Sequence, residues 1–194
     1  MSLYPFHALL GRMKYITRWA LMRCMRQESL SEHTADTALL AHALCLIARN
    51  ITHTGADIRP DTVAAAALYH DAPEILTGDM PTPIKYDNPA IRKAYKEVEA
   101  VAEEKLLHML PEEFQPVYAP ILTVTDPETE RLVKAADKLS AYIKCVEELK
   151  AGNSEFRDAA AQTRAALEEY ELPEVAYFLE TFMPSFSLTL DQLK

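Results

Sequence analysis

The sequence predicts an all-α protein built as a single domain over residues 1–194. Two observations carry this prediction: apolar residues recur at three- and four-residue spacing through most of the chain, and only four glycines interrupt it. The length lies near the upper end of what one hydrophobic core serves, about 100 to 200 residues. Because no repeat, low-complexity run or long linker divides the chain, we expect one helical bundle.

The first two long helices are predicted from an apolar stripe and two capping signals. The stripe predicts a helix over residues 32–49, with Ser31 as its N-cap. Asp61 is the corresponding N-cap for a helix over residues 62–70. Pro73 lacks the N–H that would continue this second helix, so we expect a kink just before it. The stripe consists of Leu39, Leu40, Ala43, Leu44 and Ile47.

Two later helices begin with a capping residue followed by proline, a typical helix start. Asn88 and Pro89 predict a helix to about residue 110. Asp126 and Pro127 predict another, which Gly152 closes. The second of these helices has a long apolar face: Leu132, Val133, Ala136, Leu139, Ile143, Val146 and Leu149.

The remaining segments are short or irregular. Gly78, Pro81 and Pro83 predict an irregular connection over residues 77–85, TGDMPTPIK. A helix is expected over residues 155–171, and a shorter one begins near Pro173. Residues 183–190, MPSFSLTL, are expected to form an extended tail.

The charge balance restricts the class of partner. The chain has 29 acidic and 20 basic side chains and a formal net charge of -9, so its overall field repels nucleic acid polymers and anionic lipid. A small phosphate ester can bind only where a metal ion or a local cation reverses that field. We therefore expect a small-molecule ligand, and neither a nucleic acid polymer nor a membrane as partner.

The cysteines and the N-terminus favour the cytoplasm. Three widely spaced cysteines without a CxxC motif predict neither a disulfide framework nor a zinc knuckle. Arg12 and Lys14 interrupt the apolar residues of the N-terminal segment, which has no run of signal-peptide length. The longest apolar stretches, such as residues 63–69, fall far short of the roughly 20 residues that cross a bilayer.

A histidine and an aspartate stand side by side at the end of a predicted helix. These are His70 and Asp71, with Glu74 one turn beyond His70. Mixed imidazole and carboxylate ligation suits Mn, Fe, Co, Ni or Zn, and such an ion lowers the pKa of bound water and polarises a phosphoryl oxygen. Two side chains are too few for a stable site. His33 and Asp137, on two other predicted helices, offer further ligands, as in metal sites inside helical bundles.

Taken singly, these residues have structural interpretations. A lone histidine near a helix start, such as His33, is more often a hydrogen-bonded structural residue. Asp137 lies at the margin of an apolar stripe, beside Val133 and Ala141, where a solvated carboxylate is the usual interpretation. The order favours a metal site: a histidine, then a His-Asp pair, then a distant aspartate in a helical context.

The order of His33, the pair His70-Asp71 and the distant Asp137 resembles that of the HD-domain metal-dependent phosphohydrolases. Further motifs look like the bacterial 5'-deoxynucleotidase branch of that superfamily, and the resemblance covers essentially the whole chain. It implies a helical bundle of the HD-domain type with a metal site between helices. The motifs are Arg18-Trp19, Ser31-Glu32-His33, Tyr69-His70-Asp71, residues 74–79 (EILTGD), Pro81-Thr82-Pro83 and Ala136-Asp137.

The resemblance implies one divalent metal ion, Co, Mn or another transition metal, and a catalytic carboxylate. The carboxylate is Glu74, which would position and deprotonate the attacking water or carry a proton to the leaving 5'-oxygen. Pro73 departs from the pattern expected in the HDxxE segment and is expected to shift Glu74 slightly. The implied metal ligands are His33, His70, Asp71 and Asp137.

The resemblance also implies three substrate-binding residues. Arg18 offers a permanently charged fork for two phosphate oxygens. Trp19 would lie against the sugar, where a bulky ring disfavours a 2'-hydroxyl, although a tryptophan is more often simply a core residue. Asp79 would lie close to the metal-bound water or to the sugar 3'-hydroxyl.

The expected reaction is hydrolysis of a 5'-deoxynucleoside monophosphate to a deoxynucleoside and phosphate. An alternative keeps the site but takes another small phosphate ester, such as a nucleoside triphosphate or a cyclic nucleotide. A third interpretation is a helical regulatory or scaffold protein that holds a metal ion for stability, but Glu74 and Arg18 argue against it. A homodimer is expected.

Overall fold

The structure is a computed structural model that describes residues 3–55, 57–81 and 88–194. Within these ranges the regular structure is helical, and the β contact present is an isolated antiparallel bridge between Thr17 and Ser29. The all-α prediction is therefore confirmed. No helix in the described ranges is long and apolar enough to cross a membrane.

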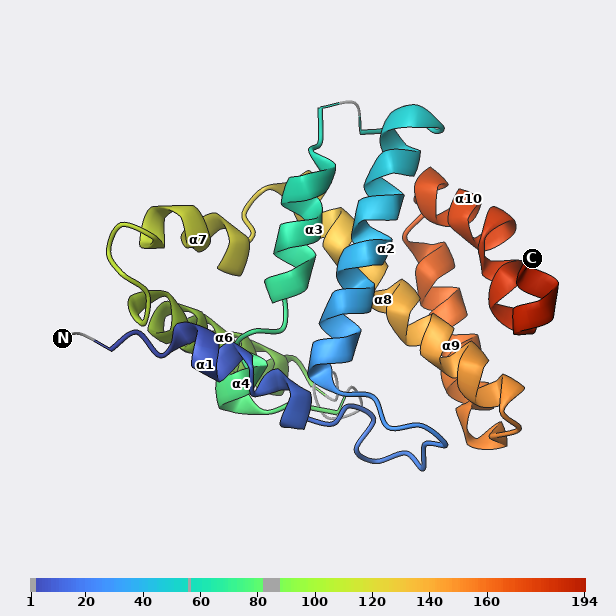
Figure 1. The fold of residues 1–194 in the computed structure, drawn as a ribbon, viewed down its shortest axis with the longest axis horizontal. Coiled ribbons are helices and arrows are strands. Elements are labelled where there is room, and N and C mark those ends of the chain that lie inside the picture. Colours follow the sequence, from blue (N-terminus) through green and yellow to red (C-terminus); the bar gives the residue numbers. More distant parts are fainter. Residues whose placement is uncertain (1–2, 56, 82–87) are drawn as a thin grey trace.

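Three helices form the centre of the molecule and contact one another in pairs: α2 (Leu30–Asn50), α3 (Pro60–Tyr69) and α8 (Pro127–Lys150) (Figure 1). Their shared core includes Leu44, Val63 and Leu139, none of which has exposed surface. Burying each such side chain contributes about 1.5 to 3 kcal/mol. This packing fixes the relative positions of the three helices that carry the candidate site residues or lead directly into them.

The apolar stripe predicted for α2 is correct apart from one residue. Leu40, Leu44 and Ile47 are buried, whereas Leu39 is 71% exposed. Because α2 packs on both α3 and α8, its buried face is turned away from Leu39 and takes in Ala41 instead.

Two predicted helix starts were wrong. Ser29, not Ser31, caps α2: its Oγ accepts the Glu32 N–H, and the Glu32 carboxylate accepts the Ser29 N–H, which completes a capping box. Helix α3 begins at Pro60, where a missing N–H costs nothing, so Asp61 lies in the first turn. The N-caps predicted at Asn88 and Asp126 are confirmed.

The C-terminal part of the chain covers α8 and α2. It contains the short 3-10 helix η2 (Ser154–Phe156), then α9 (Arg157–Glu169) and α10 (Pro173–Thr181). The prediction of an extended tail over residues 183–190 was wrong. The chain forms a 3-10 helix at η3 (Met183–Ser187), where Met183 and Phe186 pack against the main core, and a second one at η4 (Leu190–Leu193), which has no buried residue.

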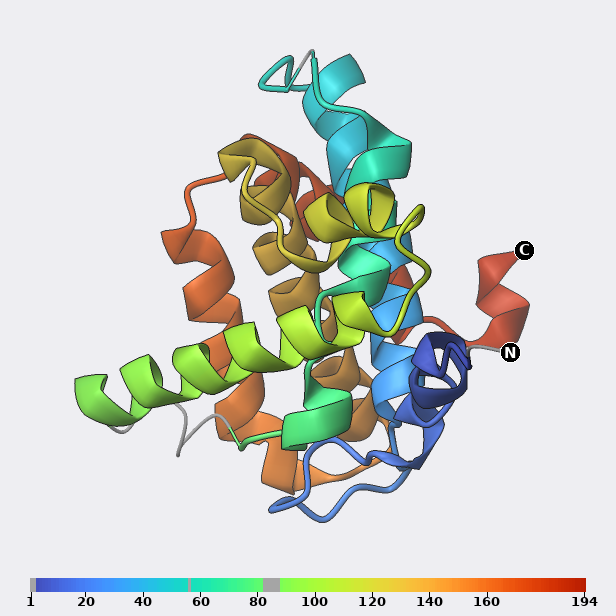
Figure 2. The ribbon, with the colours of Figure 1, turned by 90° about the vertical axis from the view of Figure 1, so that its left-hand side faces the viewer.

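A second, smaller core lies on the other side of α3. It joins α1 (Phe6–Leu10), α6 (Pro89–His108) and α7 (Gln115–Leu122). Helix α6 reaches out from the body of the molecule (Figure 2). The sequence did not predict α7, because Pro120 lies inside it and proline normally ends a helix.

An irregular segment of residues 16–29, here called the N-terminal loop, joins the 3-10 helix η1 (Met13–Tyr15) to α2. Two buried residues of α8 hold it. The Glu148 carboxylate accepts the backbone N–H groups of Met25 and Arg26 at 2.8 and 3.2 Å, and Lys144 Nζ donates to the Arg26 carbonyl at 2.6 Å. Lys144 and Glu148 also pair with each other at 2.5 Å.

Candidate metal centre and active site

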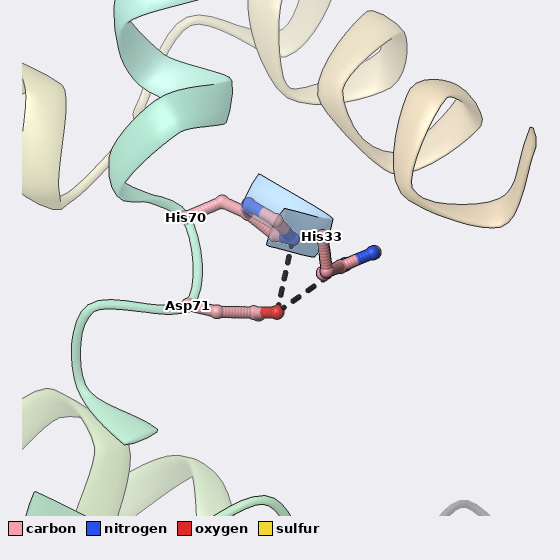
Figure 3. Close-up of side chains that lie close together, drawn as sticks. All are labelled: His33, His70 and Asp71. Carbon is pink, nitrogen blue, oxygen red and sulfur yellow. Dashed lines mark ion pairs between the residues drawn. The ribbon is translucent and has the colours of Figure 1, made fainter. Parts of the chain in front are cut away.

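Two histidines and one aspartate converge where α2 and α3 meet. His33 lies in the first turn of α2, and His70 and Asp71 directly follow α3 (Figure 3). Asp71 Oδ2 lies 3.2 Å from His70 Nε2 and 3.5 Å from His33 Nε2. One potential ligand atom from each residue lies within 4.8 Å of the other two. The structure thus brings together three of the four predicted ligands in one cluster.

The fourth predicted ligand, Asp137, reaches the cluster from α8. Its Oδ1 lies 3.1 Å from His33 Nε2 and 4.0 Å from His70 Nε2. Bonds of about 2.1 Å to a divalent ion would separate neighbouring ligand atoms by roughly 3.0 to 3.4 Å in octahedral or tetrahedral geometry. The distances of 3.1, 3.2 and 3.5 Å between nitrogen and oxygen atoms of this set are close to that range.

The outer nitrogens of both imidazoles are hydrogen-bonded. His70 Nδ1 lies 2.6 Å from the Ala67 carbonyl, which only accepts, so this nitrogen carries the proton. His33 Nδ1 lies 3.1 Å from the hydroxyl of the buried Ser140. Among the described residues, neither Nε2 atom has a hydrogen-bond partner, although both are buried. Such nitrogens, turned toward carboxylates, fit ligation of a divalent metal ion.

The electrostatics of the cluster favour a cation. Burial alone would lower the pKa of His70, but the negative charges of Asp71 and then Asp137 raise it to about 9. Burial works against ionisation of Asp71 and Asp137 as well, yet the pKa of each carboxyl is lowered, because imidazoles face it. A field that holds a proton on His70 also attracts a metal ion, which replaces that proton on binding.

The helix is interrupted, rather than kinked, between His70 and Glu74. Helix α3 ends at Tyr69, and the short helix α4 (Glu74–Thr77) begins immediately after Pro73. The Glu74 N–H donates to the Asp71 carbonyl at 3.0 Å, which ties the two residues together through the backbone. Glu74 is buried, with 5% of its surface exposed. Glu74 is therefore an enclosed carboxylic acid three positions after a candidate ligand.

Arg18 joins the N-terminal loop to the cluster. Its Nη1 lies 3.5 Å from Asp71 Oδ2, and its Nε donates to Glu28 at 3.2 Å. Burial would lower the pKa of this guanidinium, but the pKa is raised because four carboxylates act on it. These are Asp137, Asp71, Glu28 and Asp79. Arg18 is therefore a cation at the edge of an acidic site.

Trp19 and Asp79 lie near the same place. The Trp19 indole donates to Glu28, the carboxylate that also binds Arg18, and its ring packs on Phe156 with centroids 5.2 Å apart. Asp79 follows α4 and is close enough to Arg18 to raise its pKa. Of the predicted motif Pro81-Thr82-Pro83, only Pro81 lies within the described residues.

Sequence reasoning missed two residues that contact the candidate site. Ser140 lies three positions after Asp137, on the same side of α8, so helical spacing would have revealed it once Asp137 was chosen. Glu28 gave no comparable signal, because it lies in a loop without periodicity.

Comparison with known proteins supports this interpretation of the site. Residues 5–186 match the family described as 5'-deoxynucleotidase YfbR-like. A 5'-deoxynucleotidase of Vibrio parahaemolyticus is 50% identical over 190 residues, 97% of each chain.

Solved structures share the fold. An HD-domain phosphohydrolase from Listeria innocua superposes with a TM-score of 0.80 at 24% identity, over 93% of this chain and 87% of that one. A cyanophage S-2L HD phosphohydrolase, bound to dA and one catalytic Zn²⁺ ion, superposes with a TM-score of 0.66 at 21% identity, over 92% and 96% of the two chains. The match over nearly the full length to curated enzymes confirms the resemblance drawn from the motifs: the chain belongs to the YfbR-like family of 5'-deoxynucleotidases.

Proposed function

We propose that this protein hydrolyses 5'-deoxynucleoside monophosphates to a deoxynucleoside and inorganic phosphate. The observation that carries the proposal is the cluster of His33, His70 and Asp71, with Asp137 beside it, in a chain of this family. The Vibrio parahaemolyticus relative named above is a 5'-deoxynucleotidase, and it matches this chain almost from end to end. We take residues 1–194 as one phosphohydrolase domain.

The four residues are proposed to hold one divalent metal ion. A bound ion would supply Lewis-acid polarisation of the phosphoryl oxygen and a lowered pKa for bound water. His33 and His70 contribute Nε2, with their Nδ1 atoms anchored on Ser140 and the Ala67 carbonyl. Asp71 and Asp137 contribute negative charges, which offset the positive charge of the metal ion.

Glu74 is proposed to transfer the proton. As the water oxygen bonds to phosphorus, Glu74 accepts a water proton; as the bond from phosphorus to the 5'-oxygen breaks, it returns that proton to the leaving oxygen. The products are then a neutral deoxynucleoside and inorganic phosphate. The burial of Glu74 and its backbone bond to Asp71 support this role.

Arg18, Trp19 and Asp79 are proposed to bind the substrate. The Arg18 guanidinium would bind phosphate oxygens, since it is the cation beside the carboxylate cluster. Trp19 would lie beside C2' of the sugar, where its ring leaves no room for a hydroxyl. Asp79 would accept from the sugar 3'-hydroxyl or from the attacking water.

Three further properties belong to the same proposal. The ion is Co, Mn or another transition metal, because imidazole and carboxylate ligands suit that group. The enzyme works in the cytoplasm, which agrees with free thiols at Cys24, Cys45 and Cys145. It forms a homodimer, and exposed Val98 and Val101, one turn apart on α6, are a suitable apolar contact.

A substrate panel tests the proposal. Purified protein with Co²⁺ or Mn²⁺ is assayed for phosphate release from dAMP, AMP, dATP and cyclic AMP. We expect turnover of dAMP, slower turnover of AMP and little of the other two. Equal rates on dAMP and AMP would refute the deoxyribose preference. Turnover of dATP or cyclic AMP alone would assign the site to another phosphate ester, and no turnover at all would favour a structural ion.

A further inference from the structure

Glu28, at the end of the N-terminal loop, binds both residues of the Arg18-Trp19 pair. Its Oε2 accepts from Arg18 Nε at 3.2 Å and from Trp19 Nε1 at 2.9 Å. Its backbone carbonyl accepts the Arg18 N–H at 3.0 Å. Only 8% of the Glu28 side chain is exposed. One buried residue therefore forms three hydrogen bonds to two adjacent residues at the edge of the metal centre.

The backbone of Trp19 shows that this arrangement is enforced. Its φ is 60°, in the left-handed region, which a bulky residue adopts only when its surroundings require it. The bond to Glu28 and the packing on Phe156 hold the ring, and the Trp19 carbonyl accepts the Met22 N–H at 2.9 Å. Strain of this kind beside a candidate active site is a sign that the orientation of the side chain serves function.

The orientation of Arg18 depends on the same carboxylate. A guanidinium is a rigid plane, and here Glu28 binds its Nε while Asp71 faces its Nη1 at 3.5 Å. Two anchors on different edges stop the plane from rotating. No hydrogen bond from Nη2 is found within the described ranges, so that amine keeps its N–H groups for another acceptor, such as a phosphate oxygen.

We infer that Glu28 is a positioning residue, which fixes the Arg18 guanidinium for the phosphate and the Trp19 ring for the sugar at the same time. This inference rests on the proposed function, from which Arg18 and Trp19 take their substrate roles. Both bonds from Glu28 Oε2 involve a charged acceptor, and such bonds are roughly twice as strong as neutral ones. A neutral amide at position 28 therefore holds the pair more loosely.

Glu28→Gln tests the inference, with Glu155→Gln as a matched control. Glu155 also binds the N-terminal loop, but it accepts the Arg23 N–H at 3.1 Å and contacts neither Arg18 nor Trp19. We expect Glu28→Gln to raise KM for dAMP roughly tenfold and to lower the ratio of kcat/KM for dAMP over AMP by a similar factor. Metal content stays unchanged. Glu155→Gln keeps both kinetic values.

A second measurement needs no substrate. Trp19 is the only tryptophan of the chain, so the intrinsic fluorescence excited at its absorption edge reports this ring alone. Acrylamide quenching is compared for the wild type and both variants. We expect stronger quenching in Glu28→Gln and unchanged quenching in Glu155→Gln. If Glu28→Gln does not fold, Glu28→Asp, which keeps the charge but is one methylene shorter, is measured in the same way.

The outcomes separate the inference from the function on which it rests. Wild-type protein that hydrolyses neither dAMP nor AMP refutes the proposed function. The acrylamide quenching still tests whether Glu28 holds the Trp19 ring in place. Wild-type selectivity and wild-type quenching in Glu28→Gln overturn the inference. So does a Glu28→Gln enzyme with lowered kcat but unchanged KM and selectivity, because a merely structural defect reduces only the active fraction.

Discussion

The metal centre and the N-terminal loop meet at Arg18 and Asp71, yet they are held by different forces. His33, His70 and Asp137 lie on or directly after α2, α3 and α8, which are fixed by a shared apolar core. The N-terminal loop has no helix or strand: Trp19, Met22 and Cys24 pack on the apolar cluster around Phe156, and the rest of the loop is held mainly by hydrogen bonds to the buried residues Glu28, Lys144 and Glu148. The geometry of the candidate ligands therefore depends on helix packing, whereas the placement of the loop depends in large part on buried charge.

Glu148 shows how strongly the loop relies on charge. Its carboxylate accepts two backbone N–H groups of the loop, the Lys144 ammonium and the Asn153 amide. Burial by itself would raise the pKa of Glu148, but the bond from Lys144 and then those from Asn153 and the loop lower it to about 2. A buried charge is tolerated here because every contact it makes comes from a donor.

The largest expected effects on kcat come from two substitutions at the candidate metal centre. One removes a proposed metal ligand, and the other removes the proposed proton carrier. Asp137→Ala should lose the ion and lower kcat roughly a thousandfold or more, since the ion contributes several kcal/mol to the transition state. Glu74→Gln should keep the ion and lower kcat by about 10² to 10⁴. Metal per chain from elemental analysis, together with kcat for dAMP, distinguishes the two variants.

Asp61→Ala is a suitable control for this pair, because Asp61 is an exposed aspartate that pairs only with Arg59 among the described residues. It should change neither the metal content nor kcat. A Glu74→Gln enzyme with full activity would show that another group moves the proton.

An intermediate effect, on the free energy of unfolding, is expected when the pH is lowered enough to protonate Glu148, which holds the loop. The pKa of Glu148 is about 2 in the folded state against 4.5 in the unfolded chain. The stabilisation is thus fully present above about pH 4.5 and is lost as the pH falls toward 2, and it amounts to about 3 kcal/mol. Glu148→Gln should remove this part of the acid dependence. Urea unfolding at several pH values measures it.

The exposed pair of Glu130 and Lys134 provides the comparison. Glu130→Gln should change the free energy of unfolding by less than about 0.5 kcal/mol at any of these pH values. If wild type and Glu148→Gln give parallel curves of stability against pH, then buried charge does not hold the loop.

The smallest effect is expected at Ser140, which contacts the candidate ligand His33 and is not itself a candidate ligand. Ser140→Ala removes the hydrogen-bond partner of His33 Nδ1 and should weaken metal affinity roughly tenfold, while kcat at saturating metal changes little. Isothermal titration with Mn²⁺ measures the affinity. Ser154→Ala, at an exposed position of η2, is the control. Unchanged affinity in Ser140→Ala would mean that core packing alone orients His33.

The sequence predicted the helical fold well because helix signals are local. Asn88 and Asp126 cap helices as expected, and the first half of the predicted apolar face of α8 is buried, whereas Ile143, Val146 and Leu149 are only partly buried. Errors arose where two local signals competed. Pro60 and Asp61 both mark a helix start, and only the structure shows that proline takes the first position.

The candidate site was predictable only in part. Order and neighbouring motifs singled out His33, His70, Asp71 and Asp137, and the structure brings them together, although periodicity alone would have missed Asp137. The supporting contacts cross long stretches of chain: 107 residues separate His33 from Ser140. Spacing rules compare residues a few positions apart, so such contacts appear only once helices are placed.

Because α3 ends at Tyr69, the orientation of His70 is less easily lost by mutation than the orientation of His33. The carbonyls in the last turn of a helix lack partners within it, and His70 uses that of Ala67 to hold its Nδ1. Every amino acid carries this carbonyl, so substitution at position 67 cannot delete the acceptor. His33 depends instead on the Ser140 side chain, which a single codon change removes. Evolution can therefore tune metal affinity through His33 while His70 stays oriented by the backbone.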